Sequence, residues 1–129
     1  MFNSIHHVAI ICSDYQCSKR FYTEVLELRI IDENYRAERH SYKLDLALPD
    51  GKQIELFSFP NAPKRLSQPE AQGLRHLAFS VDSVEDTVVN LTAKGVEVEP
   101  IRVDEFTGKK FTFFQDPDGL PLEIYQNTL

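Results

Sequence analysis

The chain has 129 residues, of which 42% are hydrophobic and 26% charged, and this is the composition of one globular domain with a sizeable core. Its formal net charge of −6 argues against nucleic acid or an anionic membrane as the main partner. No apolar run approaches the roughly 20 residues that span a bilayer, and the first residues show no signal-peptide pattern. We therefore expect a single domain of the cytoplasm, with no membrane and no nucleic acid among its partners.

The two cysteines, Cys12 and Cys17, are five positions apart. A pair this close could form a disulfide, but two cysteines in a chain of this size fit reduced cytosolic thiols better. They therefore favour the compartment that the rest of the composition suggests.

The first half of the chain predicts the order β-α-β-β-β. An apolar run rich in Ile and Val covers 5–12, and Asp14 then begins a helix over 15–27 as its N-cap. The turn-forming residues 49–52 (Pro-Asp-Gly-Lys) join the last two of three further strands. These strands are expected at 29–33, 42–48 and 53–59.

The second half repeats this order after a segment with three prolines and no periodicity, 60–73, which is predicted to be a linker. The predicted elements are a strand at 74–81, a helix at 83–94 with Ser83 and Asp86 in capping-box spacing and Gly95 as its stop, and strands at 97–103, 110–115 and 121–126. We expect one domain, 1–129, with a first module over about 4–59 and a second over about 74–127.

An internal repeat relates the two modules. The motif Pro-Asp-Gly occurs at 49–51 and again 68 positions later at 117–119, and a glutamate follows four residues after each glycine. A repeat of this length indicates one supersecondary unit used twice, and neither copy alone could bury both faces of its sheet. The chemically rich residues that recur are His7, Glu55, His76 and Glu123.

Strand parity places these four side chains on one side of the predicted sheets. Side chains alternate between the two faces of a strand. Each histidine lies opposite the bulky residues that suit packing under a helix, and an alanine two positions later leaves room beside the imidazole. The glutamates alternate with Ile and Leu in the same way, so all four side chains are expected on the concave side.

Two imidazoles and two carboxylates that converge form a ligand set for one divalent metal ion. Mixed nitrogen and oxygen donors with two waters suit Ni, Zn, Co, Mn or Fe, whereas a structural zinc would more often be closed by thiolates. Any one of the four residues alone would more often be solvated or merely hydrogen-bonded, and it is their symmetry that favours a metal site. The other histidines are not echoed: His6, whose repeat partner is Arg75, is expected to be structural or at the surface, and His40 to be solvated.

Five motifs carry a resemblance: His-Val-Ala-Ile at 7–10, Arg-Phe-Tyr at 20–22, Ile-Glu-Leu-Phe at 54–57, Leu-Arg-His-Leu-Ala-Phe at 74–79, and Asp-Pro-Asp-Gly at 116–119 before Leu122-Glu123. Over essentially its whole length the chain resembles the vicinal oxygen chelate superfamily and, within it, the glyoxalase I-like (lactoylglutathione lyase-related) proteins. The resemblance implies an α+β fold in which two tandem βαβββ modules form a curved half-barrel sheet around a metal site, as in glyoxalase and dihydroxybiphenyl dioxygenase. It implies the ligands His7, Glu55, His76 and Glu123. It also implies a homodimer, with the metal site built within one chain or across two.

The implied activity is that of a divalent-metal-dependent lyase or isomerase of glyoxalase I type. A small substrate with two adjacent oxygens, such as a methylglyoxal–thiol hemithioacetal, would displace water from the metal, and proton loss beside its carbonyl would give an enediolate. We expect Glu123 to be the main catalytic base, because Phe113 and Tyr125 suggest a drier setting. Glu55 would be a ligand and a second base.

The chain departs from glutathione-using glyoxalases at three positions. Where those enzymes have an Arg, an Asn and an Arg near the first three ligands, this chain has Ile11, Phe59 and Gln72. The thiol is therefore expected to differ from glutathione or to be absent. The alternatives are an epimerase, a thiol transferase acting on an epoxide, a dioxygenase, or a non-catalytic small-molecule binding protein. The dioxygenase is least favoured, because Glu55 would fill a position that oxygen chemistry needs open.

Parity also predicts which residues line the mouth of the site. Lys43 and Asp45 fall on the Glu55 side, although a solvated ion pair is an equal alternative for them. Aromatic residues occupy the corresponding positions of the second module, so that one wall is charged and the other aromatic. The predicted substrate-binding residues are Lys43, Asp45, Phe57, Phe111, Phe113 and Tyr125.

Overall fold

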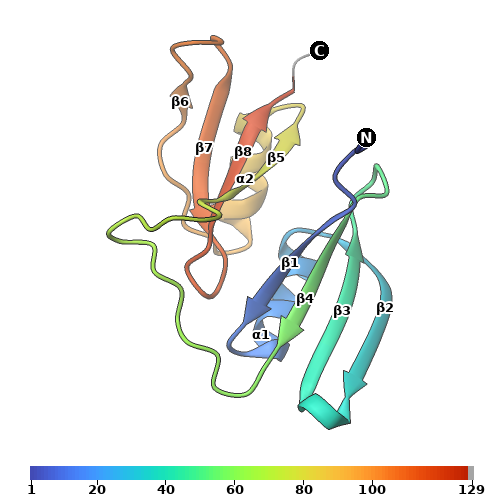
Figure 1. Ribbon diagram of the computed structural model, residues 1–129. Coiled ribbons are helices and arrows are strands. Elements are labelled where there is room, and N and C mark those ends of the chain that lie inside the picture. Colours follow the sequence, from blue (N-terminus) through green and yellow to red (C-terminus); the bar gives the residue numbers. More distant parts are fainter. Residues whose placement is uncertain (128–129) are drawn as a thin grey trace. The chain divides into compact units, whose positions relative to one another are not determined.

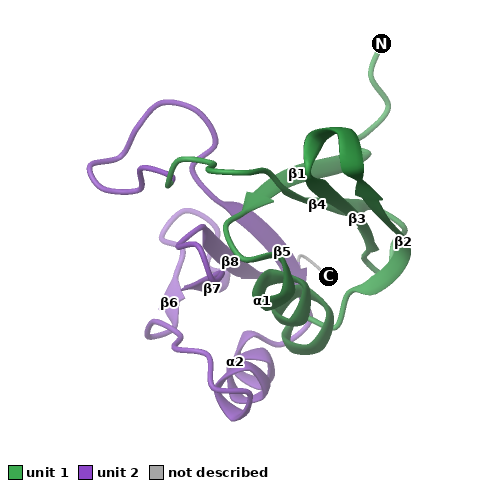
Figure 2. Ribbon diagram, turned by 90° about the horizontal axis from the view of Figure 1, so that it is seen from below, with its two compact units in different colours: residues 1–64 green, residues 65–129 purple. Residues whose placement is uncertain are grey.

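The computed structural model describes residues 1–127 (Figure 1) and divides the chain into two compact units, Met1–Lys64 and Arg65–Leu129, which Figure 2 colours separately. Each unit contains one four-stranded mixed sheet and a short α-helix. The protein is therefore of the α+β class, as predicted, and each of its sheets is open rather than closed into a barrel.

The first unit has the predicted order β-α-β-β-β, with a π-helical and a 3₁₀ turn added. Its elements are β1 (His7–Cys12), α1 (Tyr15–Arg20), a π-helical turn (Phe21–Val25), β2 (Arg29–Arg36), a 3₁₀ turn (Ala37–Arg39), β3 (Ser41–Ala47) and β4 (Gln53–Ser58). The strands lie in the order β1-β4-β3-β2, with β1 parallel to β4 and the other neighbours antiparallel. Asp14 is the N-cap of α1, as predicted, because its carboxylate accepts a hydrogen bond from the amide of Cys17.

The second unit repeats this topology. Its elements are β5 (Leu77–Val81), α2 (Val84–Ala93), β6 (Arg102–Val103), β7 (Lys110–Gln115) and β8 (Pro121–Gln126). The strand order is β5-β8-β7-β6, and β5 is parallel to β8 as β1 is to β4. The predicted cap of α2 is confirmed, because the Ser83 hydroxyl accepts a hydrogen bond from the amide of Asp86 at 3.1 Å.

The two Pro-Asp-Gly motifs form matching turns between strands. The amide of Gly51 donates to the carbonyl of Leu48, and the amide of Gly119 donates to the carbonyl of Asp116. The two glycines have φ values of +88° and +79°, which residues with a Cβ adopt only with strain. The repeat seen in the sequence is thus a repeat of backbone geometry.

One face of each sheet forms the core of its unit, and the residues on it are the ones that parity predicts. On this face the buried residues of the first sheet are Ile10, Cys12, Leu44, Leu46, Ile54 and Leu56, and those of the second are Thr112, Phe114, Leu122 and Ile124; at its two ends β3 also buries Ser41 and Ala47, which have the other parity. Helix α1 packs against β4, and α2 packs against β7 and β8. The histidines and glutamates of the repeat lie on the opposite face of each sheet from these helices.

Three predicted elements differ in extent. The helix expected over 15–27 keeps α-helical hydrogen bonding only to Arg20; its last turn is wider, and Glu27 ends it with φ +61°. The strand expected over 97–103 is only two residues long, because Pro100 has no amide hydrogen for a ladder. The strand expected over 74–81 begins at Leu77, so His76 lies just before β5.

Two further sequence expectations concern the cysteines and the membrane. Cys12 is buried and Cys17 is exposed, and they are not joined in a disulfide. Within residues 1–127, every helix is too short or too polar to cross a bilayer.

Candidate functional site

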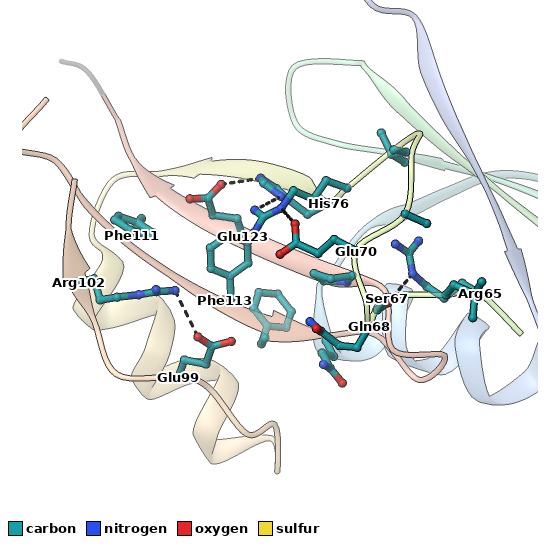
Figure 3. Close-up of a pocket in the computed structure, with 17 residues that line it drawn as sticks. Arg65, Ser67, Gln68, Glu70, His76, Glu99, Arg102, Phe111, Phe113 and Glu123 are labelled. Atoms are coloured by element: carbon teal, nitrogen blue, oxygen red, sulfur yellow. Dashed lines mark hydrogen bonds and ion pairs between the residues drawn. The ribbon is translucent and has the colours of Figure 1, made fainter. Parts of the chain in front are cut away.

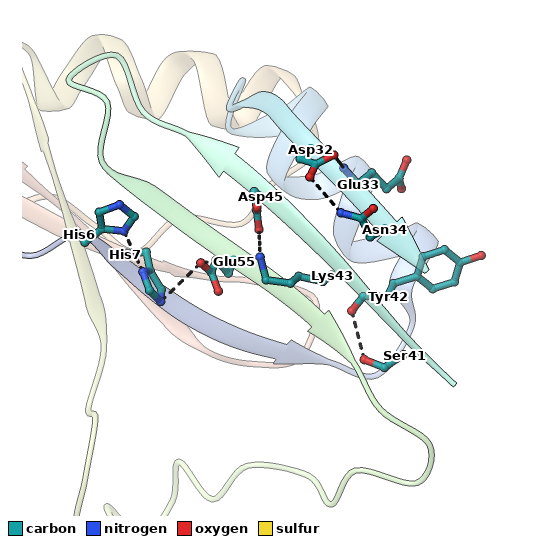
Figure 4. A network of polar contacts seen from close by, with 10 residues as sticks. All are labelled: His6, His7, Asp32, Glu33, Asn34, Ser41, Tyr42, Lys43, Asp45 and Glu55. Carbon is teal, nitrogen blue, oxygen red and sulfur yellow. Dashed lines mark hydrogen bonds and ion pairs between the residues drawn. The ribbon is translucent and has the colours of Figure 1, made fainter. Parts of the chain in front are cut away.

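The first unit brings His7 and Glu55 together on the open face of its sheet (Figure 4). Strands β1 and β4 are parallel neighbours, and Ala9 is the register partner of Glu55. Because alanine is small, the imidazole reaches across it, and His7 Nε2 lies 3.5 Å from Glu55 Oε2. The imidazole is partly exposed, while the Glu55 side chain is 14% exposed.

Lys43 and Asp45 join this pair, on the side that parity predicts. Lys43 Nζ lies 2.7 Å from Asp45 Oδ1 and 3.9 Å from Glu55 Oε2. The pKa of Lys43 is raised above its usual value, chiefly by the hydrogen bond to Asp45 and further by the charges of Asp45 and Glu55. The ammonium also lies 5.9 Å from the ring centroid of Phe57. The ion pair that the alternative expects is thus present, and its two side chains are 30% and 18% exposed.

His6, the other histidine beside the pair, is exposed and precedes β1. Its Nδ1 lies 3.0 Å from Nδ1 of His7. His6 is therefore at the surface, one of the two places expected for it, and it contacts the ring nitrogen of His7 that faces away from Glu55 (Figure 4).

The second unit contains the equivalent pair, His76 and Glu123. Ala78 is the register partner of Glu123, as Ala9 is of Glu55. His76 Nε2 lies 3.1 Å from Glu123 Oε1, and the Glu123 side chain is 13% exposed. The ring of Phe113 meets the imidazole edge to face, with centroids 5.0 Å apart. The neighbours of the two pairs thus differ: an ammonium beside Glu55, and an aromatic ring beside His76 and Glu123.

A cavity of about 560 Å³ opens beside the second pair (Figure 3). His76, Glu123, Phe111 and Phe113 line it from the sheet side. Residues of the predicted linker, including Arg65 and Glu70, line it from another side. This size is typical of small-molecule sites. Four of the residues singled out in the sequence (His76, Phe111, Phe113 and Glu123) lie in this lining, whereas the linker residues were not expected there.

Each unit also stacks an arginine from its edge strand on two phenyl rings. Arg36 Cζ lies 5.1 and 5.7 Å from the ring centroids of Phe57 and Phe59. Arg102 Cζ lies 5.0 and 5.6 Å from those of Phe111 and Phe113. Sequence reasoning missed both arginines, because the contacts depend on strand pairing; Arg102, for example, is the register partner of Phe111.

Tyr125, expected near the metal, is held by the segment between β6 and β7. Its hydroxyl donates to Asp104 Oδ2 at 2.9 Å and also contacts the hydroxyl of Thr107. The pKa of Asp104 is lowered, first by the hydrogen bond from the Phe106 amide and then by that from Tyr125. The Tyr125 ring stacks on Phe111 with centroids 6.2 Å apart. Tyr125 therefore supports the aromatic wall, and its hydroxyl is already engaged.

The donor chemistry of both pairs fits a divalent transition metal. Each pair directs one imidazole nitrogen and one carboxylate oxygen to the same place, and mixed donors of this kind suit Mn, Fe, Co, Ni or Zn. Within residues 1–127 no three His, Cys, Asp or Glu side chains gather as a metal-binding group. Each unit by itself therefore presents two donors.

Comparisons with known proteins identify the family. The model of the Glyoxalase/Bleomycin resistance protein/Dioxygenase superfamily matches residues 4–124, and the chain belongs to this superfamily. Uncharacterized protein YwkD of Bacillus subtilis is 60% identical over 98% of both chains. The crystal structure of the glyoxalase family protein from Enterococcus faecalis is 52% identical, with a TM-score of 0.90 over 96% of this chain and 98% of that one.

A more distant relative has a functional name. Metallothiol transferase FosB of Staphylococcus saprophyticus is 30% identical, covering 100% of this chain and 80% of FosB.

Two further structures share the fold at low identity. A variant of glyoxalase I from Zea mays has a TM-score of 0.81 at 20% identity, over 95% of this chain and 44% of that one. A variant of the fosfomycin resistance protein FosX from Listeria monocytogenes, complexed with Mn(II) and 1S,2S-dihydroxypropylphosphonic acid, has a TM-score of 0.74 at 21% identity, over 100% of this chain and 94% of that one. These two structures therefore share the fold of this chain, and one of them holds Mn(II).

Proposed function

We propose that His7, Glu55, His76 and Glu123 together hold one divalent metal ion, and that the protein is a metal-dependent lyase or isomerase of glyoxalase I type. The observation that carries this proposal is the repeated pair: in each unit a histidine Nε2 faces a glutamate oxygen across an alanine of the neighbouring strand. Two such pairs would supply four protein ligands to one metal ion. They would come from one chain or from two chains of a homodimer.

A divalent cation at these ligands would supply a Lewis acid that stabilises negative charge on substrate oxygens. The chain's own residues would move the proton. Glu123 is the proposed base that takes the proton beside the substrate carbonyl, since Phe113 covers the neighbouring His76 and the Glu123 side chain is 13% exposed. Glu55, which has the Lys43 ammonium 3.9 Å away, is the proposed partner ligand and second base.

The proposed substrate is a small chelating carbonyl compound such as a methylglyoxal–thiol hemithioacetal. Glutathione is not the expected thiol, because Ile11, Phe59 and Gln72 stand where glutathione-using relatives have charged or amide side chains. A protein as efficient with the glutathione adduct as with every other adduct would contradict this part of the proposal.

Transfer of a thiol to an epoxide is the second candidate, and the 30% identity to FosB over this whole chain favours it. The two activities are distinguished by what is consumed. A lyase converts the hemithioacetal without consuming free thiol beyond the adduct, whereas a transferase consumes thiol and epoxide in equal amounts. A non-catalytic binding protein would do neither.

The test is turnover of a panel of thiol–methylglyoxal adducts by protein loaded in turn with Ni, Zn, Co, Mn and Fe. Glu123→Gln should reduce turnover by roughly 10²–10⁴, the usual share of general acid–base catalysis. Glu97→Gln, at an exposed glutamate of the same unit, is the matched control and should leave turnover unchanged. Wild-type turnover in Glu123→Gln would refute the assignment of the base.

A further inference from the structure

The cavity of the second unit places two different groups on either side of one aromatic ring. Phe113 lies 5.0 Å from the His76 imidazole, centroid to centroid, and 5.6 Å from Arg102 Cζ. His76, Phe113 and Arg102 all line the cavity (Figure 3). A small molecule that reaches the His76–Glu123 pair and extends along Phe113 would therefore meet the Arg102 guanidinium.

The guanidinium of Arg102 is held in a way that suits an anion. Its Cζ lies 5.0 Å from the ring centroid of Phe111 and 5.6 Å from that of Phe113, so the charged group is within cation–π range of two rings whose planes are nearly perpendicular. The fork of N–H groups on a guanidinium matches a carboxylate with two parallel hydrogen bonds. The two rings thus restrict where the guanidinium lies before any ligand arrives.

The present partner of Arg102 is a weak competitor for that edge. Arg102 Nη2 lies 3.2 Å from Glu99 Oε1, and the two side chains are 52% and 57% exposed. Exposed pairs of this kind contribute little stability. The other arginines of the cavity, Arg65 and Arg75, bond to Ser67 and Glu70 and come from the segment before β5 rather than from the aromatic wall. Arg102 is therefore the cation of the aromatic wall that an incoming anion can engage.

The aromatic wall suits the sulfur of a thiol-derived substrate. Thioether sulfur makes favourable contacts with aromatic rings at about 5 Å. If the oxygens of the substrate lie at His76 and Glu123, its sulfur lies beside Phe113. The part of the substrate that comes from the thiol, its thiol half, then extends to Arg102. We propose that this thiol half carries a carboxylate, which the edge of Arg102 binds. This rests on the proposed function, because that function brings the substrate oxygens to the His76–Glu123 pair.

The test separates binding of the thiol half from turnover. (Methylthio)acetate carries the sulfur and the carboxylate but no carbonyl to react, and (methylthio)acetamide is its neutral match. Both are titrated into the full-length protein and followed by NMR shifts. The acetate should bind at least about tenfold more tightly than the amide, as expected for hydrogen bonds between charged groups.

Three variants assign that preference to Arg102. Arg102→Met, which keeps the aliphatic stem, should abolish the preference for the acetate over the amide. Glu99→Gln should tighten acetate binding by removing the competing carboxylate. Arg29→Met, at an exposed arginine of β2, is the control and should retain the preference for the acetate. Equal binding of acetate and amide, or an undiminished preference in Arg102→Met, would overturn the inference.

Turnover distinguishes this inference from the proposed function. If the mercaptoacetate–methylglyoxal adduct is converted faster than the 2-mercaptoethanol adduct, and Arg102→Met removes the difference, both stand. If neither adduct is converted but the acetate preference depends on Arg102, the anion site stands and the lyase function fails. If both adducts are converted equally by wild-type protein and by Arg102→Met, the function stands and the carboxylate inference fails.

Discussion

Each histidine of the repeat meets a glutamate of the same unit, and this contact is the basis of the metal proposal. His76 Nε2 is 3.1 Å from Glu123 and His7 Nε2 is 3.5 Å from Glu55. A metal that binds only the folded protein stabilises it. Loss of one imidazole should therefore change both metal content and melting temperature.

We expect His76→Ala to lose most of the bound metal and to melt at a temperature that no longer depends on added metal or chelator. Metal per chain by elemental analysis and melting by calorimetry are the measurements. His40→Asn is the matched control, because His40 is exposed and has φ +47°, a conformation that Asn tolerates. Undiminished metal in His76→Ala would exclude this residue as a ligand.

Glu33 gives a prediction about pH at the same scale. It accepts hydrogen bonds from Lys19 at 2.8 Å and from the Tyr15 hydroxyl at 2.5 Å. The first of these, and then the second, lower the pKa of Glu33. Its folded pKa is thus below its unfolded value of about 4.3, so Glu33 stabilises the fold above that value and loses this effect as pH falls through the folded pKa.

Glu33→Gln should accordingly lower the unfolding free energy at pH 7, and the difference from wild type should shrink as pH falls from about 5 towards 3. Urea unfolding at several pH values measures it. The pKa of Tyr15 moves the opposite way, raised by burial and by the hydrogen bond to Glu33. A difference that stays constant across this pH range would contradict the ionic role of Glu33.

Among the secondary-structure elements, the two helices were recognisable by their caps. Asp14 and Ser83 both accept hydrogen bonds from the amide three residues later. Helix α2 is only ten residues long. A helix of this length is marginal in isolation, so its cap and its packing against β7 and β8 both matter.

Ser83→Ala should destabilise the protein by about 1 kcal/mol, the usual cost of a lost N-cap. Ser83→Asp should retain most of the stability, because aspartate accepts the same hydrogen bond and its charge favours the helix N-terminus. Thermal unfolding of the three proteins measures the effect. Equal loss in both variants would show that Ser83 acts through something other than capping.

At the scale of the whole molecule, we predict a homodimer. Each unit has one open four-stranded sheet and presents two of the four proposed metal ligands. A complete site needs two such units, from one chain or from two. Gel filtration with light scattering at low micromolar concentration should give about twice 14.9 kDa. A monomer with its full metal content would refute the dimer and would require both pairs to come from one chain.

The sequence by itself determined the order of elements, the helix caps and the turns. It also determined which side chains share a face. These features are local: alternation has a period of two residues, and a turn or a cap is set by a few neighbouring residues. The burial of Leu56 and Leu122, with Glu55 and Glu123 on the other face, follows directly from that alternation. Local rules are also why the ends of elements were less well predicted, as at Arg20 and Arg102.

Only the tertiary structure decided which residues far apart in the sequence lie opposite one another. The pairing of β1 with β4, and of β5 with β8, brings each histidine to its glutamate. The sign of this pairing in the sequence is that nearly the same spacing between histidine and glutamate recurs in the second half. The position of Arg102 over Phe111 and Phe113 has no local signal, and neither has the path of residues 65–75 along the cavity. Contacts between residues far apart in the chain depend on the packing of the whole unit, because no short segment contains both partners.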